Sequence, residues 1–241
     1  MNAQMMYVDG VPVPIEGETN LLQLTRKAGV ELPTFCYHSE LSVYGACRMC
    51  MVEDGRGNLH AACSTPPRAG MEVFTGTPRL RKYRKTILEL LLANHCRDCT
   101  ACPKNGRCRL QELAARFGVR EIRFENRKRE PLRDRSSDSI VIDRSKCILC
   151  GDCVRMCGEV QRVGAIDFMH RGSNMVISTA FDQPIATSGC VSCGQCAAIC
   201  PTGAILIKSD KAPVWTALAD KSTKVIAQVA PAVRVAVAKE F

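Results

Sequence analysis

The sequence of 241 residues has few aromatic side chains and contains no long apolar run. Phe, Trp and Tyr make up 5% of the residues, so a core must be built mainly from aliphatic side chains. No stretch approaches the roughly 18 consecutive apolar residues of a membrane span. The opening residues, MNAQMMYVDG, carry neither the basic n-region nor the apolar h-region of a secretory signal. We therefore expect a cytoplasmic protein without a membrane partner.

Motifs for nucleotide binding and for common hydrolytic chemistry are also missing. No G-x-G-x-x-G follows a predicted strand, and there is no P-loop. No Ser-His-Asp, Cys-His or paired-carboxylate set stands out. Because the chain has no evident nucleotide or flavin site, we expect that it cannot accept a hydride by itself. It would act as a non-catalytic subunit that relays single electrons.

Cysteine is the abundant residue, with 16 in the chain. Most stand in C-x-x-C spacings, which are too short for separate structural disulfides but suit metal binding. A reducing compartment in which thiols hold metal is therefore the better interpretation. The formal net charge of +9 supports it. If fifteen thiolates hold four oxidised clusters, the holoprotein charge falls to about +2. Without base-stacking aromatic residues beside the charges, we expect no nucleic-acid partner.

An internal repeat is the strongest signal in the sequence. CILCGDCVRMC and CVSCGQCAAIC both follow C-x2-C-x2-C-x3-C. Three closely spaced cysteines wrap around one 4Fe–4S cluster, and the fourth reaches the other cluster. The spacing, which resembles that of two-cluster bacterial ferredoxins, predicts two crossed ligand sets: Cys147, Cys150, Cys153 and Cys200 for one cluster, and Cys190, Cys193, Cys196 and Cys157 for its twin. A pair of zinc sites is the alternative, although zinc favours two separated cysteine pairs.

The N-terminal group has the spacing C-x10-C-x2-C-x12-C. It resembles the 2Fe–2S pattern of the complex I and hydrogenase family more than that of plant ferredoxins. The resemblance implies one 2Fe–2S cluster, and zinc is again the alternative. The proposed ligands are Cys36, Cys47, Cys50 and Cys63.

The third group, NHCRDCTACPKNGRC, includes a histidine. It resembles the set of one histidine and three cysteines that holds a 4Fe–4S cluster in FeFe-hydrogenases and in the largest peripheral subunit of complex I. The implied ligands are His95, Cys99, Cys102 and Cys108. Cys96 is then left over, and the alternative is that Cys96 replaces His95 as the fourth ligand. An imidazole makes the site less negative than a fourth thiolate would, which should raise its reduction potential.

The cysteine groups divide the chain into five segments of an α+β protein. We expect a β-grasp 2Fe–2S domain over 1–78, with a hairpin at Asp9-Gly10, a helix capped by Thr19 and a helix end at Gly29. Two helices should flank the histidine-containing loop in 79–118. The segment 119–146 is interpreted as a charged, solvated connector. The two-cluster ferredoxin-like domain covers 147–210 and should include a hairpin between the repeats. The tail, 211–241, reads as a buried strand followed by Pro and a second apolar segment.

The order of the three cysteine groups resembles the accessory-cluster region of FeFe-hydrogenase large subunits. The tail, VIAQVAPAVRVAVAKEF, is similar to the opening strand of their catalytic domain. The remainder of that domain and the cysteines of its H-cluster do not follow in this sequence, so we expect no hydrogen chemistry. The tail could dock to a partner or fold back on the ferredoxin domain.

The resemblance implies a function in an electron-bifurcating NAD(P)-dependent complex of the transhydrogenase type. Its partners would be a flavin- and NAD-binding subunit resembling the NADH-binding subunit of complex I, a thioredoxin-like 2Fe–2S subunit and a soluble ferredoxin. Three alternatives remain at this point. The chain could be the electron-input subunit of a hydrogenase or formate dehydrogenase, a free polyferredoxin, or a zinc-binding protein.

Overall fold

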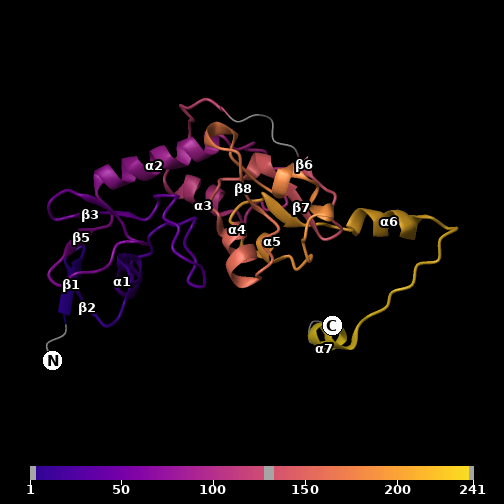
Figure 1. Ribbon diagram of the computed structural model, residues 1–241, viewed down its shortest axis with the longest axis horizontal. Helices are drawn as coiled ribbons and strands as arrows, with labels where there is room; N and C mark the ends of the chain where they lie inside the picture. Colours follow the sequence, from indigo (N-terminus) through magenta and orange to yellow (C-terminus); the bar gives the residue numbers. More distant parts are fainter. Residues whose placement is uncertain (1–3, 128–132, 239–241) are drawn as a thin grey trace. The chain divides into compact units, whose positions relative to one another are not determined.

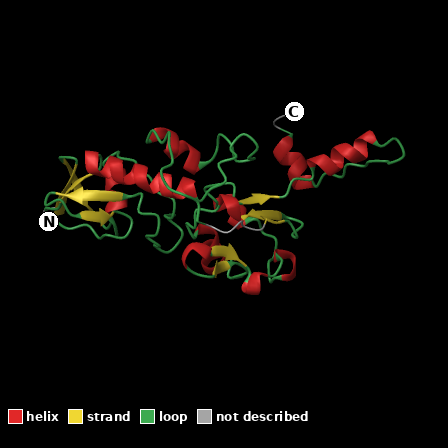
Figure 2. Ribbon diagram, turned by 90° about the horizontal axis from the view of Figure 1, so that it is seen from above, coloured by secondary structure: helices red, strands yellow, loops and turns green. Residues whose placement is uncertain are grey.

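The computed structural model describes residues 4–127 and 133–238. The chain separates into two units, Met1–Ile207 and Lys208–Phe241, and each is considered by itself. Unit 1 contains all sixteen cysteines. Figures 1 and 2 show its mixed α+β content, with short strands and with helices of different lengths joined by long loops. No helix in the described ranges is long and apolar enough to cross a lipid bilayer.

The N-terminal part of unit 1 is a five-stranded sheet of order β2-β1-β5-β3-β4, with β1 and β5 parallel. The predicted hairpin is confirmed, since β1 and β2 pair antiparallel about Asp9 and Gly10, both at positive φ. Helix α1 packs Leu21, Leu22 and Leu24 into the core against this sheet. The bounds are β1 Gln4–Val8, β2 Val11–Ile15, α1 Leu21–Lys27, β3 Met51–Asp54, β4 Leu59–Ala61 and β5 Glu72–Phe74.

One detail of helix α1 differs from the prediction. The N-cap is Asn20 and not Thr19, because the Asn20 side chain accepts a hydrogen bond from the backbone N–H of Gln23 at 3.1 Å. Thr19 instead donates its backbone N–H to the side chain of Gln23 at 2.8 Å. Both residue types cap helices well, so the sequence alone could not separate them. The predicted end is correct, with Gly29 at φ 78° just after the helix.

The two helices predicted around the third cysteine group are present as α2, Pro78–Ala93, and α3, Arg109–Arg116. Helix α2 is attached to the sheet through the buried guanidinium of Arg84, which donates to the carbonyl oxygens of Met49, Met51 and Thr75 at 3.1, 2.7 and 2.8 Å. Burial lowers the pKa of Arg84 to about 10. Because the three carbonyls satisfy the charged group, it can remain buried without a carboxylate partner.

The C-terminal part of unit 1 contains the repeat. It has a three-stranded sheet of order β10-β7-β6 and two short helices, α4 and α5, which lie beside the cysteine loops. Strands β8 and β9 pair as the predicted hairpin. The bounds are β6 Arg133–Asp134, β7 Ile140–Asp143, α4 Asp152–Arg155, a π-helical turn Met156–Val160, β8 Asp167–Met169, β9 Val176–Ser178, α5 Gln195–Ile199 and β10 Ile205–Ile207. Single 3₁₀ turns occupy Arg144–Lys146, Gly172–Asn174, Ala180–Asp182 and Ile185–Thr187.

The segment interpreted as a connector contributes to this sheet. Strand β7 lies at the centre, between β6 and β10, and buries Ile140 and Ile142. The alternating pattern of these two isoleucines is short and follows a long charged stretch. For this reason the sequence did not predict the strand. Residues 133–143 are therefore structural and not a solvated linker, whereas residues 128–132 of the same segment lie outside the described ranges.

Unit 2 differs from its prediction. Its described residues form helices α6, Lys211–Ala219, and α7, Pro231–Val237, and contain no strand. The apolar run expected as a buried strand is irregular, and Ile226 in it is 78% exposed. A β-prone run forms a strand only when a neighbouring strand accepts its hydrogen bonds. Pro231 instead occupies the first turn of α7, where its missing N–H has no cost.

Candidate iron–sulfur centres

The cysteines of the N-terminal group lie in two close pairs. The backbone N–H of Cys47 donates to Cys36 Sγ at 3.3 Å, and that of Phe35 donates to Cys47 Sγ at 3.4 Å. Cys50 and Cys63 form the second pair and are hydrogen bonded through their side chains. Two pairs of thiols suit a 2Fe–2S group, because four cysteines serve its two irons.

The pairing perturbs these thiols strongly. The hydrogen bond from Cys36 lowers the pKa of Cys47 to about 7, and the same contact raises the pKa of Cys36. The side-chain contact with Cys63 raises the pKa of Cys50. Cys47 is therefore the more acidic thiol of the Cys36–Cys47 pair. The N–H groups aimed at sulfur would stabilise a ligand thiolate in the same way.

The first crossed set predicted from the repeat lines a single cavity. Cys147, Cys150 and Cys153 reach it from the loop before α4 and from α4 itself, and Cys200 reaches it from the end of α5. The remaining walls are mostly apolar, with Ile142, Ile148, Ile177, Pro201, Ala204 and Ile205 among the lining residues. Burial raises the pKa of both Cys150 and Cys153. Metal binding at this site must therefore release protons.

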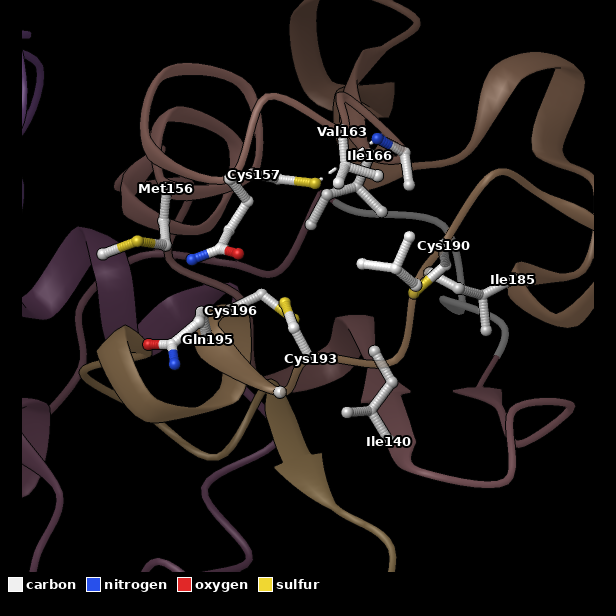
Figure 3. Close-up of a pocket in the computed structure, with 14 residues that line it drawn as sticks. Ile140, Met156, Cys157, Val163, Ile166, Ile185, Cys190, Cys193, Gln195 and Cys196 are labelled. Atoms are coloured by element: carbon white, nitrogen blue, oxygen red, sulfur yellow. Dashed lines mark hydrogen bonds between the residues drawn. The ribbon is translucent and has the colours of Figure 1, made fainter.

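The second crossed set lines another cavity, shown in Figure 3. Cys157, Cys190, Cys193 and Cys196 direct their sulfur atoms toward the same space, beside Ile140, Val163, Ile166 and Ile185. The backbone N–H of Ala165 donates to Cys157 Sγ at 3.3 Å. Cys193 is the exposed member of the set. The fourth cysteine of each repeat thus lies with the first three of the other repeat, the arrangement that the spacing predicted.

The two cysteine loops share a backbone conformation that the sequence reasoning missed. Leu149 and Gly151 in the first repeat, and Ser192 and Gly194 in the second, have positive φ values between 56° and 78°. A Cβ atom at Gly151 would lie 3.0 Å from Phe168 Cζ. The glycine after the second cysteine of each repeat was a visible signal for this conformation. It turns the chain so that consecutive cysteines face one space.

The third group is built around the end of α2. His95 is 9% exposed, and its Nδ1 accepts a hydrogen bond from the backbone N–H of Arg97 at 3.0 Å. Iron coordination through either ring nitrogen would require this contact to be given up, since a neutral imidazole has one lone pair to donate. Burial, followed by repulsion from Cys108 and Cys102, raises the pKa of Cys99. The backbone N–H of Cys102 donates to the carbonyl oxygen of Cys99 at 3.2 Å, so these two cysteines lie close together.

Cys96 differs from His95 in its surroundings. It is exposed, whereas His95 is buried. Its backbone N–H donates to the carbonyl oxygen of Ser145 at 3.0 Å, which attaches this loop to the ferredoxin-like part. Gly203 lies at the same junction, where a Cβ atom would be 2.8 Å from Cys102 Sγ. The histidine-containing loop is therefore packed directly beside the loop that follows Cys200.

The positions of the donor side chains can also be compared with the geometry of a site for one metal ion. Within the described ranges, no three Cys, His, Asp or Glu side chains converge closely enough to hold one metal ion. The cysteine sets of the repeat surround cavities whose other lining residues are mostly apolar. The donor chemistry and the cavities both fit iron–sulfur clusters.

Arg155 links the loop that carries Cys36, Cys47 and Cys50, the candidate 2Fe–2S loop, to the repeat. Its Nη2 donates to the carbonyl oxygen of Cys36 at 2.9 Å and to Asp152 Oδ1 at 2.5 Å, while Nη1 donates to the carbonyl oxygen of Ser42. Its guanidinium also lies 5.4 Å from the ring centroid of Tyr44. Burial raises the pKa of Asp152 to about 6, against the opposing effect of Arg155. The Cys36 loop is thus held on helix α4, which carries Cys153.

Further contacts reinforce this junction. The rings of Tyr44 and Phe168 stack with centroids 5.7 Å apart, and Glu159 accepts hydrogen bonds from the backbone N–H and the hydroxyl of Ser42 at 2.9 and 2.5 Å. Cys36 and Cys150 share one buried apolar cluster with residues of α2 and α3. The Cys147–Cys200 site therefore has two neighbours, the 2Fe–2S loop on one side and the histidine-containing loop on the other.

Comparison with known proteins gives three successive family matches along the chain. A 2Fe–2S iron–sulfur cluster binding domain matches residues 5–78. The NADH-ubiquinone oxidoreductase-G iron–sulfur binding region matches 84–123, and a 4Fe–4S dicluster domain matches 146–204. These matches confirm the fold class and the presence of both cluster types that the cysteine spacing predicted. The match over 84–123 includes the histidine-containing loop but does not assign its ligands.

Individual relatives agree with the family matches. The NADP-reducing hydrogenase subunit HndD of Solidesulfovibrio fructosivorans is 38% identical over the whole of this chain, which covers 42% of that protein. The mitochondrial NADH dehydrogenase [ubiquinone] iron–sulfur protein 1 of Solanum tuberosum is 36% identical over 95% of this chain, which covers 31% of that protein. A chain in the crystal structure of an NAD⁺-reducing NiFe-hydrogenase in the H2-reduced state is 29% identical, with a TM-score of 0.79 over 86% of this chain and 88% of that one.

The chain spans less than half the length of these curated relatives. The resemblance to hydrogenase accessory regions and to the largest peripheral subunit of complex I is confirmed over the segments that carry the cysteines. In this chain a 2Fe–2S domain, an oxidoreductase-G iron–sulfur region and a 4Fe–4S dicluster domain follow one another, and over these segments the chain is similar to the NADP-reducing hydrogenase protein HndD and to the mitochondrial NADH dehydrogenase iron–sulfur protein 1.

Proposed function

We propose that this chain is the iron–sulfur electron-transfer subunit of an NAD(P)-linked oxidoreductase complex. The observation that carries the proposal is the packing of three cysteine groups into one unit, with Arg155 joining the 2Fe–2S loop to the repeat and Gly203 beside Cys102. When bound, iron–sulfur clusters supply reversible one-electron chemistry. The names of the relatives, an NADP-reducing hydrogenase and an NADH dehydrogenase, support the same class of complex.

The chain's own residues have separate tasks in this proposal. One 2Fe–2S cluster would be held by Cys36, Cys47, Cys50 and Cys63. The three 4Fe–4S clusters would be held by His95, Cys99, Cys102 and Cys108; by Cys147, Cys150, Cys153 and Cys200; and by Cys157, Cys190, Cys193 and Cys196. The apolar walls around the last two sets exclude water and limit the polarity of the sites. Backbone N–H groups that donate to sulfur stabilise the thiolates and tune their potentials.

The finer proposal concerns the reaction. We infer an electron-bifurcating complex of the transhydrogenase type, in which the chain connects a flavin- and NAD-binding subunit and a thioredoxin-like 2Fe–2S subunit to a soluble ferredoxin. An electron-input subunit of a hydrogenase or formate dehydrogenase is the second candidate, and the HndD relative favours its hydrogenase form. Unit 2 is proposed to dock to a partner, because Trp215, Ile226 and Val235 are each more than 70% exposed.

Anaerobic purification of the native complex from its own host tests these proposals. We expect about 14 irons per chain with little zinc, and co-purification of flavin-containing subunits. Assays with NADPH, formate and hydrogen then identify the reaction, and limited proteolysis compares unit 2 in the complex and in the free chain. A colourless chain that elutes alone and contains zinc would contradict the electron-transfer proposal. A coloured chain that elutes alone would favour a free polyferredoxin.

Replacement of His95 by cysteine tests the histidine ligand. The fourth thiolate should keep the cluster but lower its reduction potential by on the order of 100 mV, because it adds negative charge at the site. Redox titration followed by electron paramagnetic resonance (EPR) measures the shift. Cys96→Ser is the matched control and should leave both the signal and the potential unchanged. Loss of the cluster in Cys96→Ser, together with its retention in His95→Ala, would show that Cys96 is the ligand.

A further inference from the structure

A groove lies between the first half of α2 and the end of α3. Four cationic side chains line it and are exposed: Arg81, Lys82, Lys85 and Arg116. The other lining residues are mainly apolar and include Val30, Leu32 and Pro33. The lining contains one acidic residue, Glu31, which already forms an ion pair with Arg109 at 3.0 Å. The groove therefore presents a strong excess of positive charge.

The four cations of this groove are not neutralised within the fold. Among the residues that the structure describes, none of them forms an ion pair with a carboxylate. Arg81 and Lys85 stand four residues apart on α2, a spacing at which like charges destabilise a helix. Arg116 also lowers the pKa of Arg84, after the larger effect of burial. An anionic surface placed in the groove would relieve this repulsion.

The floor of the groove connects it to the 2Fe–2S loop. Arg84 lines the groove and donates to the carbonyl oxygens of Met49 and Met51, the residues on either side of Cys50. A partner seated here would thus lie one side chain away from the backbone that carries a proposed 2Fe–2S ligand.

We propose that this groove docks a carboxylate-rich surface of the protein that exchanges electrons with the 2Fe–2S site. The proposal rests on the electron-transfer function proposed above. A protein surface fits better than a small anion, because the cations are spread over two helices and share the groove with apolar residues, as in the mixed interfaces of protein complexes. Opposite charge would speed the encounter and orient the partner, and its effect should weaken as salt is added.

The test uses the native complex, separated at high salt into this chain and its remaining subunits. Wild-type chain and the double variant Lys82→Glu/Lys85→Glu are recombined with those subunits, and the association rate is measured at several salt concentrations. We expect the variant to associate at least about tenfold more slowly at low salt and to lose most of the salt dependence. Arg56→Glu/Arg171→Glu changes the net charge equally at exposed sites elsewhere and should have little effect.

Three further measurements make the result decisive. The iron content and the 2Fe–2S spectrum of Lys82→Glu/Lys85→Glu and of Arg56→Glu/Arg171→Glu must equal those of the wild type. The charge-conserving variant Lys82→Arg/Lys85→Arg should associate at the wild-type rate. Poly-L-glutamate should compete with association, whereas inorganic phosphate at the same ionic strength should not. Competition by phosphate alone, or equal slowing by the control variant, overturns the docking groove. In that case wild-type recombination and turnover would still support the proposed function, which fails separately if the wild-type chain has neither iron nor partners.

Discussion

Replacing Cys200 by alanine is expected to damage the cluster of Cys147, Cys150 and Cys153 and to spare the one nearer in sequence. The reason is that Cys200 lines the cavity of the first three cysteines, whereas Cys190, Cys193 and Cys196 share theirs with Cys157. Iron content should fall by up to about four irons per chain, with loss of one 4Fe–4S EPR signal. Anaerobic iron analysis and EPR of the reduced protein measure both effects.

The reciprocal variant is the control for crossed ligation. Cys157→Ala should damage the cluster held by the second repeat and leave the first intact. The two variants should therefore lose different EPR signals, although each removes the fourth cysteine of its own repeat. If Cys200→Ala instead removed only the signal lost in a Cys193→Ala variant, the ligand sets would not be crossed.

Replacing Arg155 by methionine is expected to weaken the junction between the 2Fe–2S loop and the repeat. The change removes the donors to the carbonyl oxygens of Cys36 and Ser42 and leaves the carboxylate of Asp152 buried without its cation. Loss of one partner of a buried ion pair costs about 3–5 kcal/mol. Anaerobic chemical denaturation measures the free energy of unfolding, and stopped-flow reduction measures electron transfer between the two sites, which should slow.

Two further variants test whether the loss of stability and the slower electron transfer arise at the junction. Arg155→Lys keeps the positive charge near Asp152 but cannot reach several acceptors with one planar group, so its effect should be intermediate. Arg171→Met changes an exposed arginine and should leave both quantities unchanged. Wild-type stability together with wild-type electron-transfer rates in Arg155→Met would show that Arg155 does not hold the two parts together.

Local patterns account for most of what could be predicted. The hairpin at Asp9-Gly10, the helices around the histidine-containing loop and the hairpin between the repeats depend on residues close in sequence, and each is present. The placement of each fourth cysteine at the cavity of the other repeat was also predictable, because the fourth cysteine of C-x2-C-x2-C-x3-C cannot reach the cluster that the first three surround. Asn20 was missed as the cap because Thr19 carries the same capping chemistry.

The predictions were wrong where the structure of a segment depends on a partner that is distant in the sequence. Strand β7 was read as part of a charged connector, since its hydrogen bonds depend on β6 and β10. The apolar run containing Ile226 was read as a strand, but the described part of unit 2 provides no neighbouring strand to pair with it. Arg155 and Arg84 resemble ordinary surface arginines in the sequence, and their carbonyl acceptors lie 9 to 119 residues away along the chain.

The sequence by itself determined which donor side chains this protein offers, because thiol and imidazole groups at fixed short spacings limit which inorganic groups can bind. It also predicted that the two repeats exchange their fourth cysteines, and the structure places each fourth cysteine at the cavity of the other repeat. Only the tertiary structure decided which centres are neighbours, since the contacts of Cys36 with Arg155 and of Gly203 with Cys102 join segments more than 100 residues apart. Packing brings such segments together because it buries their surfaces and gives their charged groups partners. The spacing of residues within one segment contains no information about these contacts.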